Sequence, residues 1–155
     1  MIKSLTVTDP DITDKGPIIE VTIPKPEGYH RFHDGRSIPL SSITEEIKPI
    51  QVKALIDTGS ANCWIADWIV DKFGLLNLGG KKARNTLGIE HISGTYQATI
   101  IFPTEPLELE IPGIAQNLPL IDSNFDCIIG RAILEHCTFT YNGKQNKFTM
   151  EFEVD

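Results

Sequence analysis

The stretch Ala54-Leu55-Ile56-Asp57-Thr58-Gly59-Ser60 sets a single acidic residue between an apolar run and a turn. Apolar and β-branched residues fill much of 50–56, which is typical of a buried strand. Thr-Gly-Ser then ends that strand in a tight turn. Burying a carboxylate costs roughly several kcal/mol unless hydrogen bonds or a shared proton relieve it. We therefore expect Asp57 to have either a partner or a chemical role.

A second informative segment, Phe125-Asp126-Cys127-Ile128-Ile129-Gly130-Arg131-Ala132-Ile133-Leu134, follows later in the chain. Asp-Thr-Gly-Ser after apolar residues resembles the active-site loop of aspartic proteases. The second segment resembles the apolar-apolar-Gly-Arg stretch that opens the C-terminal helix of retropepsin-like (retroviral-type) aspartic proteases. In this order and at this separation the two motifs are moderately specific, and the resemblance spans roughly residues 50–152.

The resemblance implies an all-β fold, the retropepsin-like closed β-barrel (acid-protease fold) with one short C-terminal helix. Residues 1–155 are expected to form one retropepsin-like aspartic protease domain. Within it, residues 46–155 make the family-like core, and residues 1–45 are an N-terminal extension with outer strands and a long loop. The expected function is that of an aspartic endopeptidase, a peptide hydrolase that needs no metal and no cofactor.

Composition agrees with a globular protein of this size. The chain has 41% hydrophobic and 23% charged residues, enough to bury a core. A net charge of −7 argues against a nucleic-acid partner. No apolar run reaches the roughly 18–20 residues of a membrane span, and no signal region begins the chain, so we expect a cytoplasmic protein without a membrane partner. Three cysteines without a Cys-x-x-Cys pair fit reduced core thiols.

Periodicity and turn residues give the expected elements. Strands are predicted over 2–8, 17–23, 45–55, 63–65, 95–102, 107–111, 138–141 and 147–154, and helices over 66–73 and 131–137. Residues 25–42 read as a long surface insertion and 75–85 as a loop. Residues 86–102 are expected to form a hairpin with its tip at 88–94, and 118–121 lead to the second motif. Asn142-Gly143 suits a two-residue turn between the last two strands.

The resemblance implies a role for each residue of the loop. Asp57 is the catalytic carboxylate, Thr58 braces the paired loops through its hydroxyl, and Gly59 lies beside the substrate with its backbone. Ser60 bears on pH, because a hydroxyl that donates to the ionised carboxylate favours activity under more acid conditions.

The resemblance also implies a substrate-binding flap and a structural support. The flap residues are Gly88, Ile89, Glu90, His91 and Ile92. Gly130 and Arg131 fasten the C-terminal helix beneath the active-site loop. Retroviral sequences commonly follow the loop with an acid that pairs with this arginine, whereas this chain has Ala61-Asn62, so the sequence does not identify the partner of Arg131. Ala132 also replaces the Asp or Asn that often follows the arginine.

Peptide hydrolysis by this route requires two carboxylates that share one proton. The chain has one Asp-Thr-Gly, and Asp122-Ser123-Asn124 lacks the glycine and precedes the Gly-Arg segment. The second carboxylate must therefore be Asp57 of another copy, which makes a homodimer part of the mechanism. The terminal strand over 148–154 is expected to pair across that dimer, as in the family. The predicted partners are a peptide or protein substrate and a second copy.

Other readings of the same residues stay open. The alternative function is a non-catalytic peptide-binding module on a protease-like fold, favoured by the missing acid and the long insertion. A third is a structural subunit whose Asp57 only caps a turn, so that Asp57→Asn costs stability. His30, His33, His91 and the His136-Cys137 pair lack zinc-like spacing. Cys63 has no basic partner placed by the sequence and is expected to be a buried thiol.

Overall fold

The computed structural model describes residues 1–24, 30–33, 36–39, 48–75, 77–84, 88, 90–118 and 124–155. Strands dominate these residues, and the helices are short. In chain order the elements are β1 (Ile2–Thr8), α1 (Ile12–Lys15), β2 (Ile18–Ile23), β3 (His30–His33), β4 (Arg36–Pro39), β5 (Ile50–Ile56), β6 (Cys63–Ala66), α2 (Asp67–Phe73), β7 (Asn77–Arg84), β8 (Glu90–Phe102), β9 (Leu109–Leu118), β10 (Cys127–Ile129), α3 (Arg131–Leu134), β11 (Cys137–Asn142) and β12 (Lys147–Glu153).

The larger sheet has the strand order β2-β5-β10-β6-β9-β8-β7. Two of its neighbouring pairs are parallel, β5 with β10 and β6 with β9, and the other pairs are antiparallel. A further pairing between Thr22 of β2 and Ile101 of β8 joins the two sides of the sheet into a ring. The prediction of an all-β closed barrel with a short C-terminal helix is confirmed, and α3 is that helix.

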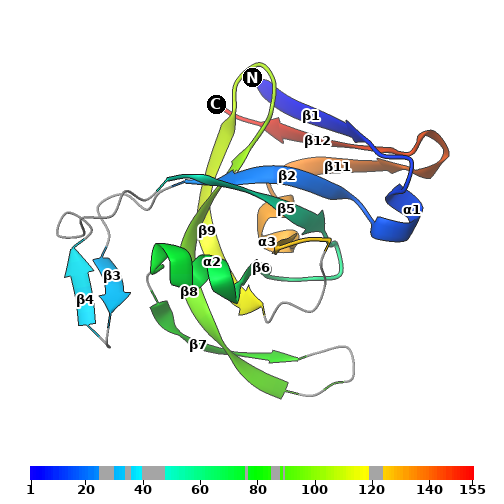
Figure 1. The fold of residues 1–155 in the computed structure, drawn as a ribbon. Coiled ribbons are helices and arrows are strands. Elements are labelled where there is room, and N and C mark those ends of the chain that lie inside the picture. Colours follow the sequence, from blue (N-terminus) through cyan, green and yellow to red (C-terminus); the bar gives the residue numbers. More distant parts are fainter. Residues whose placement is uncertain are drawn as a thin grey trace.

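A second, antiparallel sheet has the order β1-β12-β11 and lies across one end of the barrel (Figure 1). The two chain ends lie close together, and the Met1 amino group donates to the Val154 carbonyl oxygen at 2.9 Å. β12 is the middle strand, so β1 and β11 occupy both of its edges along nearly its whole length. The expectation that residues 148–154 pair across a dimer is therefore wrong, because the chain's own N-terminal strand takes that edge.

One hydrophobic core joins the two sheets. The strands that face it alternate buried and less buried residues, as in β12, where Phe148, Met150 and Phe152 point inward. Phe152 meets Phe102 of β8 with ring centroids 5.3 Å apart. Burial of an aromatic side chain of this size contributes roughly 1.5–3 kcal/mol. The terminal sheet is thus packed onto the barrel through its aromatic residues.

Three local predictions are wrong. Residues 77–84, read as a loop because of Gly79-Gly80 and the following basic residues, form β7, and Gly79 there has a φ of 121° at an irregularity in the pairing with β8. Residues 90–94, placed in the tip of the hairpin, belong to the long strand β8. The last hairpin turns through a 3₁₀ segment, Gly143–Gln145, and a left-handed Asn146, instead of a two-residue turn.

Other predictions are confirmed or only partly covered. Strands β1, β2 and β6 and helix α2 lie close to their predicted bounds, and Gly74 ends α2 in the left-handed conformation. The strand predicted over 45–55 begins later, since β5 runs from Ile50 to Ile56. Helix α1 was not predicted. Of the insertion at 25–42, the described residues form the β3–β4 hairpin, and the others lie outside the described part of the chain. Residues 119–123 lie outside it too.

Candidate active site

Asp57 follows the last residue of β5, where that strand runs parallel to β10. Ile56 pairs with Ile129, and the Asp57 N–H donates to the Ile129 carbonyl oxygen at 3.0 Å. Parallel strands end at the same edge of a sheet. The two motifs, about seventy residues apart in the sequence by their numbers, are therefore brought together, with the Asp57 loop beside Gly130 and Arg131.

The loop closes on the Asp57 carboxylate. Its Oδ1 accepts the Gly59 N–H at 2.9 Å, and the Asp57 carbonyl oxygen accepts the Ser60 N–H at 3.2 Å. A Cβ at position 59 would lie 3.1 Å from Oδ1, tighter than most such contacts, so glycine at this position lets the turn lie close to the carboxylate. Asp57 is half-buried, whereas Thr58 and Gly59 are exposed. The carboxylate is thus fixed by its own turn at the protein surface.

Arg131 has a partner that the sequence could not identify. Its Nη1 donates to the Thr58 carbonyl oxygen at 2.7 Å, inside the Asp57 loop. Its backbone N–H donates to the Ser60 carbonyl oxygen at 2.8 Å, and the Ala132 N–H donates to that of Ala61 at 3.1 Å. The start of α3 therefore holds the loop through three hydrogen bonds to backbone oxygens, with no need for the acid that is absent at Ala61-Asn62.

Gly130 is required by a close approach of backbone to backbone. Gly130 is buried, and any residue can adopt its φ of −96°. A larger residue is therefore excluded by lack of space and not by the backbone conformation. A Cβ at this position would collide with the carbonyl group of Asn62 and lie 2.7 Å from the Ser60 carbonyl oxygen. These are backbone atoms that no rotamer change can move aside. Glycine at 130 thus allows α3 to approach the loop closely enough for the hydrogen bonds of Arg131 and Ala132.

The Ser60 hydroxyl makes a different contact from the expected one. It donates to the Asn62 carbonyl oxygen at 2.8 Å and accepts the indole N–H of Trp64 at 3.1 Å. A hydroxyl has one proton to donate, and here that proton goes to Asn62. The expectation that Ser60 donates to the carboxylate is therefore wrong for this chain, and Ser60 instead stabilises the turn into β6.

The flap predicted from the sequence corresponds to the β7–β8 hairpin, which pairs out to Arg84 and Glu90. Gly88 is exposed and has a φ of 79°, a conformation that favours glycine. The backbones of Glu90, His91 and Ile92 lie in β8, while their side chains, like all of Ile89, lie outside the described part of the structure.

A polar link at the base of this hairpin was missed by sequence reasoning. The Asn117 side chain accepts the Gly94 N–H at 2.7 Å and donates to the Asp67 carboxylate at 2.8 Å. One amide thereby joins β8, β9 and α2. No local pattern marks Asn117, because its partners are distant in sequence and one of them is a backbone group.

Cysteine and metal chemistry have little support among the described residues. Burial raises the pKa of the Cys63 thiol, against the smaller opposing effect of hydrogen bonds with the backbone of Gly130 and Ile133, so the reactive thiolate is disfavoured. In the part of the chain that is described, no group of three or more His, Cys, Asp or Glu side chains could hold a metal ion. The side chains of His30, His33 and His91 are not among those described. No helix of the described residues is long and apolar enough to cross a membrane.

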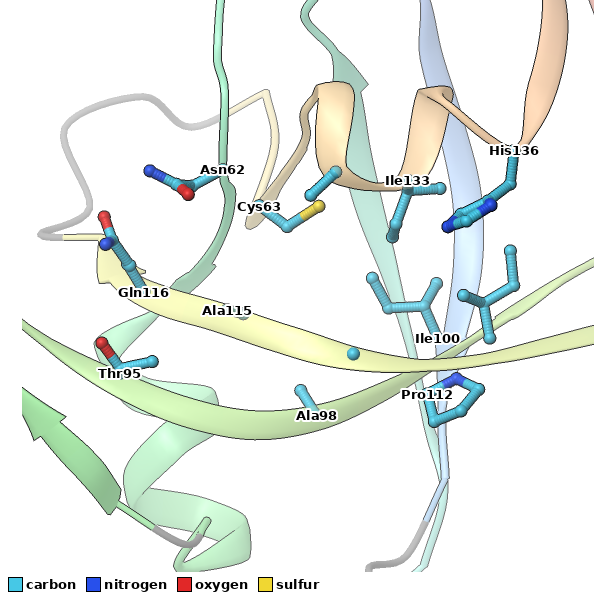
Figure 2. A pocket seen from close by; sticks show the side chains of 13 residues that line it. Asn62, Cys63, Thr95, Ala98, Ile100, Pro112, Ala115, Gln116, Ile133 and His136 are labelled. Carbon is cyan, nitrogen blue, oxygen red and sulfur yellow. The ribbon is translucent and has the colours of Figure 1, made fainter.

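A pocket of about 430 Å³ lies between the β8–β9 pair on one side and β6 with α3 on the other (Figure 2). Its walls include Asn62 and Cys63 of the β6 segment, Ala98 of β8, Gln116 of β9 and Ile133 of α3. None of the residues of the Asp57–Ser60 loop lines it. The pocket is therefore distinct from the surface that carries the carboxylate.

The chain matches no model of a known protein family and no curated protein. Solved structures similar to it include a retropepsin-like aspartic protease from Rickettsia conorii, with 12% identity, 90% of this chain and 95% of that chain covered, and a TM-score of 0.45. They also include the retroviral protease-like domain of Ddi1 from Leishmania major, with 16% identity, 68% of this chain and 86% of that chain covered, and a TM-score of 0.41. At identities this low, neither similarity assigns a reaction, a substrate or an assembly to this chain.

Proposed function

We propose that this chain is an aspartic endopeptidase whose active site forms when two copies bring their Asp57 carboxylates together. The observation that carries the proposal is the bracing of the Asp57 loop by α3, through Arg131 to Thr58 and Ser60 and through Ala132 to Ala61. An ordinary surface turn needs no such support. A catalytic carboxylate does, because its position relative to the substrate must hold within a fraction of an ångström.

The proposed reaction uses one proton shared by the two carboxylates. The ionised Asp57 takes a proton from a water molecule as that water attacks the carbonyl carbon of the scissile bond. The protonated Asp57 of the other copy donates its proton to the carbonyl oxygen, which gives a neutral tetrahedral diol. Collapse of the diol breaks the C–N bond: the amine leaves with the proton of one carboxyl group, while a hydroxyl of the diol gives its proton to the other carboxylate as the new carbonyl forms. The dyad therefore again holds one proton.

The exposed position of the loop supports assembly around it. Thr58 and Gly59 are exposed in the single chain. A second copy related by a two-fold axis would bring the same loop against it, with Thr58 available for contact. The terminal strand is not the link, since β12 is already paired on both edges. The active-site loops themselves would thus form the centre of the interface.

The substrate would be a peptide in extended conformation, held between the β7–β8 hairpins and the Asp57 loops by main-chain hydrogen bonds. We propose Gly88, Ile89, Glu90, His91 and Ile92 as the segment that covers it. A single domain and a cytoplasmic setting remain part of the proposal, in keeping with free thiols at Cys63, Cys127 and Cys137.

Cleavage of a diverse peptide pool across about pH 4–7, where a carboxylate dyad titrates, tests the proposal. The wild type should cut peptides, with rates that fall as pH rises, and Asp57→Asn should not cut. Asp14→Asn is the matched control, because Asp14 is an exposed carboxylate on α1. A folded wild type that cuts nothing at any of these pH values, or cutting that survives Asp57→Asn, would contradict the proposal.

A second candidate is the non-catalytic peptide-binding module, and one observation favours it. The family resemblance predicts that the terminal strand pairs with a second copy. In this chain β12 instead pairs with β1 on one edge and with β11 on the other. A chain that remains monomeric at micromolar concentration and binds peptides without cutting them would support this candidate. The same result would exclude the two-carboxylate mechanism.

A further inference from the structure

The β7–β8 hairpin leaves the barrel at a level that is marked by glycines. β8 pairs with β9 from Thr95 onward, whereas the described pairings of residues 90–94 are with β7 alone, and this part of the hairpin extends away from the rest of the barrel (Figure 1). At this level Gly94 lies opposite Gly80, and the neighbouring Gly79 has a φ of 121° where the pairing register shifts. Glycine within a strand weakens it and often marks a bend. The hairpin can therefore bend along this line.

The side chain of Asn117 holds β8 at the same level. The pairing of β8 with β9 reaches Thr95 and Gln116, and the next residue of β8, Gly94, donates its N–H to the Asn117 Oδ1 at 2.7 Å. The backbone of Asn117 is fixed in the barrel, since it pairs with Ile65 of β6. Asn117 thus ties the first residue of the projecting hairpin to the barrel.

A second contact fixes the orientation of the Asn117 side chain. Its Nδ2 donates to the carboxylate of Asp67, the first residue of α2, at 2.8 Å, so its oxygen is left to face Gly94. Tyr96 lies at the same place, because a Cβ on Gly94 would come within 2.7 Å of the Tyr96 hydroxyl oxygen. Burial raises the pKa of this hydroxyl, and the negative charges of Asp67 and Asp71 raise it further, as expected of a ring beside α2.

We propose that Asn117 is a positioning residue, which sets how closely the β7–β8 hairpin covers a peptide over the Asp57 loop. This inference rests on the proposed function, since it takes the hairpin as the segment that covers the peptide. Main-chain hydrogen bonds to a peptide form only where the covering backbone lies within about 3 Å of it. A hairpin that bends freely at its glycines would be in reach for only part of the time, and the apparent affinity would fall by that fraction.

Exchanging the two linked side chains tests the inference. Asn117→Asp still accepts the Gly94 N–H, but it has no proton for Asp67 and places two carboxylates within hydrogen-bond distance. Asp67→Asn alone keeps an oxygen that accepts from Asn117. In the double variant the amide at position 67 donates to the carboxylate at position 117, which restores the link with its polarity reversed. Asn142→Asp is the matched control, because the Asn142 side chain accepts the Gln145 N–H in the turn between β11 and β12.

Hydrogen exchange, followed by mass spectrometry, reports on the hairpin and needs no substrate. Asn117→Asp should speed exchange within 77–84 and 90–96 about fivefold, the factor that corresponds to loss of one hydrogen bond. Exchange in β1 and β12, which belong to the other sheet, should not change. The double variant and Asn142→Asp should exchange as the wild type does. Asn117→Ala, which removes both hydrogen bonds without adding a charge, takes the place of Asn117→Asp if that variant does not fold.

Kinetics separate a positioning role from a merely structural one. For a peptide that the wild type cuts, KM should rise about fivefold in Asn117→Asp while kcat stays within about twofold, because the covering hydrogen bonds hold substrate and transition state alike. The double variant should return KM to the wild-type value. A merely structural link would instead lower the amount of folded enzyme, so that kcat would fall and KM would not change.

Three results would overturn the inference: hairpin exchange unchanged in Asn117→Asp, a double variant that does not restore both exchange and KM, or a fall in kcat with KM unchanged. A wild type that cuts no peptide contradicts the protease proposal and leaves the exchange measurement in force. The affinity of the chain for the peptides of the pool then takes the place of KM. Equal peptide affinity in the wild type and Asn117→Asp would overturn the inference in that case.

Discussion

Replacing Gly130 with alanine should destabilise the protein and release the Asp57 loop. The added Cβ would collide with the Asn62 carbonyl group and approach the Ser60 carbonyl oxygen to 2.7 Å. Overpacking against fixed atoms costs about 1–3 kcal/mol. Separation of α3 from the loop would also weaken the hydrogen bonds from Arg131 N–H and Ala132 N–H, each worth about 1 kcal/mol. The free energy of unfolding should fall by about 3–5 kcal/mol in total.

Urea unfolding monitored by tryptophan fluorescence measures this loss. With an m-value of roughly 2 kcal/mol per molar urea, the unfolding midpoint should fall by about 2 M. Gly143→Ala is the matched control, since a Cβ there would meet only an ordinary contact of 3.4 Å with Tyr141, and its stability should stay within about 0.5 kcal/mol of the wild type. A midpoint for Gly130→Ala equal to that of the wild type would refute the close approach on which the bracing of the loop depends.

Three further predictions concern the loop and the core. Arg131→Met removes the 2.7 Å hydrogen bond to the Thr58 carbonyl oxygen. Because the arginine is exposed, the free energy of unfolding should fall by only about 1 kcal/mol, whereas kcat should fall at least about tenfold. A kcat equal to that of the wild type would contradict the positioning role of Arg131. Ser60→Ala removes an acceptor for the Trp64 indole N–H and should lower the free energy of unfolding by about 1 kcal/mol. The acid limb of the pH–rate profile should stay in place. A shifted limb would show that the Ser60 hydroxyl acts on the carboxylate. Burial, together with nearby negative charge, raises the pKa of the Cys127 thiol from 9.0 to about 12. Between these two pH values the folded chain keeps a proton that the unfolded chain loses, so the free energy of unfolding should fall as pH rises. Thermal unfolding between pH 9 and 11 should show a shallower fall for Cys127→Ala, and identical slopes would count against this origin.

Elements with a strong local signal could be predicted from the sequence. The turn residues that separate β1 from β2 and the apolar run into Asp57 indicate strands, and a glycine at position 74 indicates the end of α2. The pairing of the two motifs could also be anticipated from the family resemblance. In each of these cases a few neighbouring residues carry the information.

Features that depend on distant partners could not be predicted. β7 contains two adjacent glycines and a basic cluster, and it is a strand because β8 pairs with it along its length. The partner of Arg131 is a backbone carbonyl, which leaves no trace in side-chain identity. The partner of the terminal strand was predicted from the family resemblance to be a second copy, whereas in this chain β12 pairs with the chain's own β1. Gln116 is one polar residue in a strand, and only the structure shows that its amide is buried with no hydrogen-bond partner among the described residues.

A mixing experiment tests whether two Asp57 carboxylates from two copies make one active site. Wild type and Asp57→Asn are unfolded and refolded together at constant total concentration, and peptide cleavage is measured against the wild-type fraction. If only dimers with two aspartates cut, activity should follow the square of that fraction, about one quarter at equal amounts. Asp14→Asn mixed in the same way should leave activity unchanged. Activity in direct proportion to the wild-type fraction, about one half at equal amounts, would mean that each chain cuts alone and that no shared active site exists.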